Sequence, residues 1–94
     1  MTLVIQIVGM VNGMPTPHDG KYLREYDATR SGIDPDGVPW IHLVTTPDKQ
    51  EAQKFDDLLS ARACWMQIDL NNPVRPDGRP KRPMTIFSIT LESA

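Results

Sequence analysis

Reactive side chains are scarce in this sequence. Among its 94 residues, one is cysteine (Cys64) and two are histidines (His18 and His42). A single cysteine excludes an intramolecular disulfide and a metal cage made of thiolates, and such cysteine usage is typical of a reducing compartment. The apolar segment 1–11 has no basic leader and is broken by Gln6 and Gly9, which argues against a signal peptide or a membrane span. We therefore expect a cytoplasmic protein with no membrane contact.

The length and composition limit the architecture to one modest core. Apolar residues form 39% of the chain, which suffices for a single domain spanning residues 1–94. A domain of this size has a thin stability margin, because it buries a smaller share of its surface than a larger one. A homodimer is one way for such a chain to cover more of its surface.

Four segments have the β-propensity of strands. The segment 3–8 is rich in β-branched residues, 21–27 alternates with Tyr22, Arg24 and Tyr26 on one face, and 39–46 and 84–91 are apolar and β-branched. Proline and glycine predict a loop over 12–20 and a long hairpin connection over 28–38. The last strand is expected to be central or well paired.

One helical region is expected between the third and fourth strands. Apolar residues recur at intervals of three and four through 48–68, including Ala52, Phe55, Leu58 or Leu59, Ala61 or Ala63, Trp65 and Ile68. The pattern fits either one helix or a short turn followed by a main helix over about 57–67, with Asp57 able to cap it. The sequence thus predicts an α+β fold in the order β-β-β-α-β: a mainly antiparallel four-stranded sheet with one helix on one face.

No group of residues in the sequence fits a catalytic or metal-binding pattern. Cys64 stands late in the predicted helix among apolar neighbours, where both the dipole and burial oppose a thiolate. The two histidines have no ligand spacing of a known kind, and Asp34 begins a turn that lacks the acidic residue a calcium loop needs at Thr45. The carboxylate pairs Asp34/Asp36 and Asp56/Asp57 read as a turn and a helix cap. We expect no enzyme activity, cofactor or metal.

Charge is distributed unevenly along the chain. The net charge is −2 in total, and the cations of the C-terminal part gather in a basic loop, residues 75–82, that contains Arg75, Arg79, Lys81 and Arg82. Prolines stiffen this loop and so reduce the entropy lost when it engages a phosphate backbone or an acidic protein surface. A solvated connector is the alternative interpretation.

Aromatic residues suggest a second candidate surface. Trp40, Tyr22 and Tyr26 on neighbouring predicted strands could stack on bases, with Arg24 among them, as in sheet-based RNA binders. The alternative is that these aromatic rings pack under the helix.

Three segments resemble blocks in small uncharacterised proteins encoded by phages and prophages. These segments are 19–27, 45–48 with Ala52 and Phe55, and 75–80. The resemblance implies an accessory protein that occupies a surface of a host or defence protein complex, such as a CRISPR effector.

The functional hypothesis is therefore a small non-catalytic binding protein. Its candidate binding residues are those of the basic loop and the aromatic face: Arg75, Arg79, Lys81, Arg82, Arg24, Tyr22 and Tyr26. The alternatives are a nucleic-acid-binding accessory protein that uses the basic loop, and a virion or assembly component.

Overall fold

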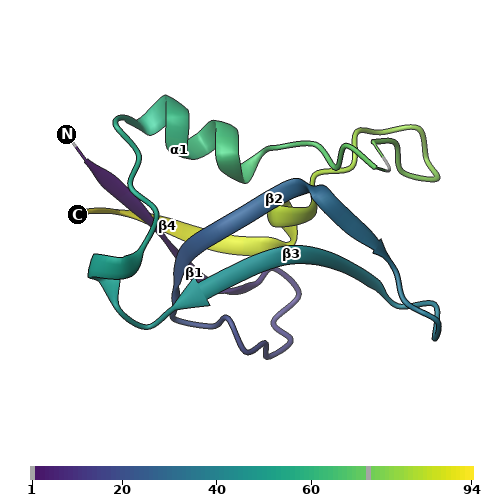
Figure 1. The fold of residues 1–94 in the computed structure, drawn as a ribbon, viewed down its shortest axis with the longest axis horizontal. Helices are drawn as coiled ribbons and strands as arrows, with labels where there is room; N and C mark the ends of the chain where they lie inside the picture. Colours follow the sequence, from purple (N-terminus) through teal and green to yellow (C-terminus); the bar gives the residue numbers. More distant parts are fainter. Residues whose placement is uncertain (1, 72) are drawn as a thin grey trace.

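The computed structural model describes residues 2–71 and 73–94, and in them it shows one sheet, one α-helix and two short 3-10 helices (Figure 1). In chain order the elements are β1 (Leu3–Met10), β2 (Tyr22–Ile33), β3 (Pro39–Thr46), η1 (Lys49–Glu51), α1 (Leu58–Trp65), η2 (Pro83–Ile86) and β4 (Phe87–Ser93). The predicted α+β fold and its element order are confirmed.

The sheet is antiparallel and has the strand order β3-β2-β1-β4. The last strand is well paired, because β4 runs beside β1 from Leu3/Ser93 to Met10/Phe87. It lies at an edge of the sheet, however, and not at the centre. The helix α1 packs on β1. After α1 and η2, the chain adds β4 on the side of β1 opposite β2.

The core lies between α1 and the sheet, in which the β2–β3 and β1–β4 ladders are joined by a short pairing of β1 with β2. β1 and β2 pair at Gln6/Tyr22, with further bonds from Ile7 N to Lys21 O (2.8 Å) and from Gly20 N to Ile7 O (2.7 Å). The β2–β3 and β1–β4 ladders are much longer. The buried residues that share this core are Ile5, Ile7, Leu23, Phe55, Ala61, Met84 and Phe87.

Two irregularities in β2 change which side chains share a face. The register with β3 shifts between Leu23 and Glu25, so the alternation of side chains is interrupted at Arg24. As a result Leu23 and Tyr26 both pack on the core. The prediction that Tyr26 shares a face with Tyr22 and Arg24 is wrong, because simple alternation cannot anticipate a bulge.

The second irregularity overturns the long hairpin connection predicted for 28–38. The register jumps between Asp27 and Ser31, and β2 then continues to Ile33. A tight turn, Asp34 to Val38, joins β2 to β3. The glycine and serine of this segment indicated a loop, but pairing with β3 keeps the backbone extended.

The helical region matches the second of the two predicted alternatives. Asp48 caps the short η1, and the Asp57 carboxylate caps α1 by accepting the Ser60 N–H at 2.8 Å. Phe55 is buried, but it lies in an extended bridge to Leu3 and not on a helix. Of the predicted helical stripe, Ala61 is buried and Trp65 packs on the core, whereas Leu58 and Leu59 in the first turn of α1 are exposed.

The C-terminal strand begins three residues later than predicted. Residues Pro83–Ile86 form η2, where proline stands in the first turn and the Thr85 hydroxyl donates to Arg82 O at 2.7 Å. Met84 in this turn is fully buried and plugs the core. The β-propensity of 84–86 is overridden by this packing.

Candidate functional site

The two Pro-Asp-Gly tripeptides fold into the same kind of turn. In the first turn, Gly37 N donates to Asp34 O (2.9 Å) and Asp34 N donates to Val38 O (3.0 Å). In the second turn, the equivalent bonds run from Gly78 N to Arg75 O (2.9 Å) and from Arg75 N to Arg79 O (2.8 Å). Both glycines have positive φ, 82° and 85°, as a type I turn followed by a bulge requires. Both turns project at the end of the molecule opposite the chain termini, called the turn end below (Figure 1).

The basic loop is closed at its base by main-chain hydrogen bonds. Lys81 N donates to Pro73 O (2.9 Å), and Asp69 N donates to Lys81 O (2.9 Å). The Arg82 guanidinium donates to Met66 O, just after α1. The loop is therefore an ordered excursion held to the domain.

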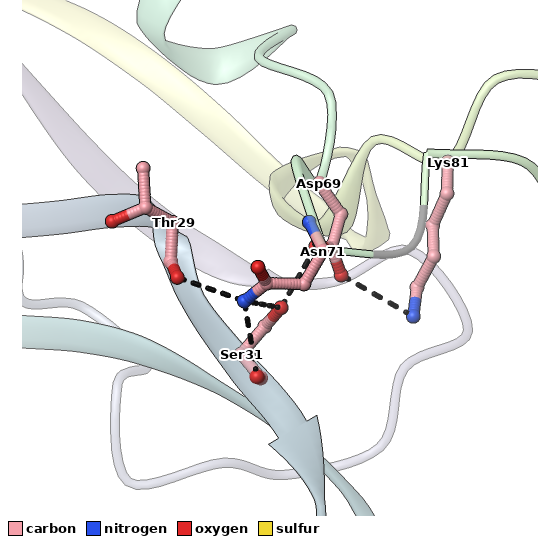
Figure 2. A network of polar contacts seen from close by, with 5 residues as sticks. All are labelled: Thr29, Ser31, Asp69, Asn71 and Lys81. Atoms are coloured by element: carbon pink, nitrogen blue, oxygen red, sulfur yellow. Dashed lines mark hydrogen bonds and ion pairs between the residues drawn. The ribbon is translucent and has the colours of Figure 1, made fainter.

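A buried carboxylate ties the loop to β2 (Figure 2). Asp69 is 1% exposed, and its Oδ1 accepts the Ser31 hydroxyl (2.7 Å) and the Asn71 N–H (2.9 Å). Its Oδ2 lies 3.5 Å from Lys81 Nζ. These bonds offset the cost of removing the carboxylate from water.

The irregular part of β2 supplies further bonding groups for the same segment. Leu70 N donates to Ala28 O (3.1 Å), and Asn71 Nδ2 donates to Thr29 O (2.8 Å) and Ser31 O (3.2 Å) (Figure 2). Sequence reasoning missed this network because its partners are about forty positions apart and each residue type is common in loops.

The four predicted cations of the basic loop line one hollow of about 630 Å³. Two of them are engaged in holding the loop, Lys81 with Asp69 and Arg82 with Met66. Arg75 lies 3.7 Å from Asp77, an exposed pair of small energetic weight. Arg79 is exposed, and no ion pair of it is found among the described residues.

The other predicted binding residues do not join this hollow. Arg24 lies 3.6 Å from Glu51. A hydrogen bond to Glu92 is the main cause that raises the pKa of Tyr22. Tyr26 packs on the core, and burial, with a smaller contribution from Asp69, raises its pKa to about 12.

The turn end carries an exposed tryptophan. The Trp40 indole lies against Gly32, where a Cβ would come within 3.1 Å of the ring, and 47% of the residue stays exposed. A hollow of about 240 Å³ beside it is lined by Trp40, Ile41, Lys81, Pro83 and Ile86. Lys81 lines both this hollow and the larger one, so the two are neighbours. The sequence singled out Trp40 but gave no signal that it would lie beside the basic loop.

The histidines and the cysteine occupy separate environments. His18 Nδ1 lies 2.8 Å from Thr45 Oγ1, and burial is the main cause that lowers its pKa. His42 Nε2 lies 3.4 Å from Glu25 Oε2, and burial raises the pKa of the Cys64 thiol. Within residues 2–71 and 73–94, no three His, Cys, Asp or Glu side chains gather as metal ligands would.

Among the described residues, no helix is long and apolar enough to cross a membrane. Comparisons with protein-family models, with curated proteins and with solved structures returned no match for this chain.

Proposed function

We propose that this chain is a non-catalytic binding module that engages another protein through the turn end. The observation that carries the proposal is Trp40, half exposed and seated beside an apolar hollow and the basic loop. Tryptophan and arginine next to an apolar pocket form the residue set that dominates protein interfaces. Ile33 and Ile86, 69% and 44% exposed, extend the apolar part of this surface.

The charge at the turn end favours a protein partner over nucleic acid. Asp77 lies beside Arg75, Asp69 lies beside Lys81, and Asp36 stands in the neighbouring turn. These carboxylates offset much of the positive charge that the basic loop has in the sequence. A phosphate backbone requires a surplus of cations, whereas a mixed surface around an aromatic anchor suits a protein.

The resemblance to small phage-encoded proteins supports the choice of partner. Following it, we propose that the partner is a host or defence protein complex and that binding takes place in the cytoplasm of the host cell. A protein of this kind acts by covering a functional surface of its target.

Affinity purification from host lysate with wild-type protein and two variants tests this proposal. The double variant Trp40→Ala/Arg79→Ala removes the aromatic anchor and an exposed arginine that has no ion pair among the described residues, and we expect it to lose the partner that wild type retains. Met14→Ala is the matched control, since Met14 is 61% exposed on the β1–β2 loop. It should retain the partner.

A partner that binds the double variant as well as wild type would refute the turn end as the binding surface. A labelled single-stranded oligonucleotide tests the nucleic-acid alternative in the same set. Affinity that falls by about 0.7 log units per log unit of salt for each phosphate contacted, and that needs Arg75 and Arg79, would establish that alternative instead.

A further inference from the structure

The outer edge of β4 has main-chain groups directed away from the sheet. Ile7 uses both its N–H and its C=O toward the β2 side, in bonds with Lys21 and Gly20. Ile7 and Ile89 are therefore a non-hydrogen-bonded pair of the β1–β4 ladder, and the N–H and C=O of Ile89 point to the free edge. Leu3 likewise uses both its N–H and its C=O in bonds with Phe55, away from β4. The main-chain groups of its partner Ser93 therefore also point to the free edge, and by alternation so do those of Leu91.

Over residues 87–91 this edge lacks the usual features that prevent strand pairing, and Glu92 is the one charged residue of β4. Residues 87–91 contain no proline and no charge, and β4 itself is free of bulges. The bulge in the β1–β4 ladder is on β1, at Val8. An edge with this composition is a template for another strand.

Apolar surface continues beside the edge on the helix side of the sheet. A hollow of about 470 Å³ lies between α1 and β4, with Leu58, Trp65, Ile89 and Leu91 among its lining residues. Leu58 and Leu59 are 58% and 75% exposed. A partner that extends the sheet at this edge would therefore have apolar surface available beside the new strand.

We propose that the partner at this edge is a second copy of the chain, paired antiparallel through β4 with the two-fold axis at Thr90. In this register, residues whose main-chain groups point to the free edge lie opposite one another in the two copies. Ile89 lies opposite Leu91 of the second copy, and such a pair forms two main-chain hydrogen bonds, one in each direction. Glu92, the charged residue of β4, lies opposite Ser88 and not opposite another acid. The edge can thus hydrogen-bond to itself without placing like charges opposite each other, as a two-fold interface requires.

This pairing does not depend on the proposed function. The turn end projects opposite the chain termini, whereas β4 begins next to Ile86 and runs toward those termini (Figure 1). Trp40 and the basic loop lie outside the paired strand and would stay open to other partners in the dimer.

The register is tested by cysteine cross-linking in a Cys64→Ala background, which removes the native thiol. Thr90→Cys places two thiols at the axis, in a non-hydrogen-bonded pair whose Cα atoms are about 4.5 Å apart, within the range of a disulfide. Ser88→Cys is the control, because four residues of strand, about 13 Å, separate its two copies. We expect a covalent dimer from the first variant only. Equal cross-linking of both, or of neither, would overturn the register.

Sedimentation equilibrium with two lysine variants tests the interface without cross-links. Thr90→Lys puts two like charges at the axis and should raise the dimer dissociation constant about tenfold or more. Ser88→Lys adds the same charge opposite Glu92 and should leave dimerisation intact. Thermal unfolding of each variant confirms that the fold is retained. A wild-type mass of 10.6 kDa up to high concentration, or assemblies larger than a dimer, would refute the proposal.

Discussion

At the scale of single residues, two buried polar side chains, Asp69 and Tyr26, differ in how fully they are hydrogen-bonded. Asp69 is almost fully buried and receives bonds from two residues as well as an ion pair. The hydroxyl of Tyr26 is also buried, and no hydrogen-bond partner for it is found in the described part of the chain. A buried donor without a partner costs more than a satisfied one contributes. These two residues therefore predict opposite responses to removal of their polar groups.

Tyr26→Phe should not destabilise the protein and should raise the free energy of unfolding by up to about 1 kcal/mol, because it deletes a desolvated hydroxyl and keeps the ring in the core. Urea denaturation followed by circular dichroism measures the change. Tyr22→Phe is the comparison, because it deletes a phenol that hydrogen-bonds to Glu92 and should give no gain in stability. Absorbance titration of Tyr26→Phe should lose the tyrosine whose pKa burial raises to about 12. A clear loss of stability in Tyr26→Phe would show that the hydroxyl is bonded.

His18 predicts a pH dependence of stability near neutrality. Burial and nearby Lys21 lower the pKa of His18 below its ordinary 6.5, and Asp19 opposes them. The unfolded state then binds the proton more readily, so His18 costs nothing above pH 6.5 and destabilises the fold as the pH falls from there through its folded pKa. Between about pH 7.5 and about pH 5, the titration range of histidine, the free energy of unfolding should depend less on pH in His18→Gln than in wild type. An unchanged slope in that variant would assign the effect to other groups.

At the scale of elements, the position of the basic loop is decided by an irregular strand. The register jump in β2 leaves the carbonyls of Ala28 and Thr29 outside the ladder with β3, and Leu70 and Asn71 bond to them. The same stretch brings the Ser31 hydroxyl to Asp69. An element that looks like a defect in the sheet is thus the attachment point of the loop.

Asp69→Ala should lower the free energy of unfolding by about 2–3 kcal/mol, because Ser31 and Asn71 lose their acceptor and Lys81 loses its counterion. Ser31→Ala removes one bond and should cost about 1 kcal/mol. In Asp69→Ala, the main-chain amides of residues 69 and 81 should exchange their hydrogens faster than in wild type, while the amides of the β1–β4 ladder stay protected. Uniform loss of protection would mean that the loop and the sheet unfold as one unit.

The elements predicted from local patterns were mostly right, and the failures have a common cause. Strong β-propensity correctly predicted β1 and β3, and the capping residue Asp57 correctly predicted the start of α1. The face of Tyr26, the length of β2 and the turn at Pro83–Ile86 depend on bulges and on core packing, which are contacts between distant segments.

At the scale of the whole molecule, binary patterning was enough to specify the fold class. Period-two runs and one capped helical stripe leave few ways to bury the apolar residues of so short a chain. The place of β4 at an edge could not be read from its composition, because a strand buried on one face has the same pattern at the centre and at the edge. That place decides whether the chain can pair with a second copy.

The α+β architecture, the two Pro-Asp-Gly turns and the scarcity of reactive groups follow from the sequence alone, since each depends on local propensity or on composition. The folded chain, in contrast, places Trp40 beside the basic loop, Lys81 next to Asp69, and Tyr26 in the core. These relations are set by strand register and by chain reversal, which no local pattern encodes. A shift of one residue in register moves a side chain to the other face of the sheet without any change in the local pattern.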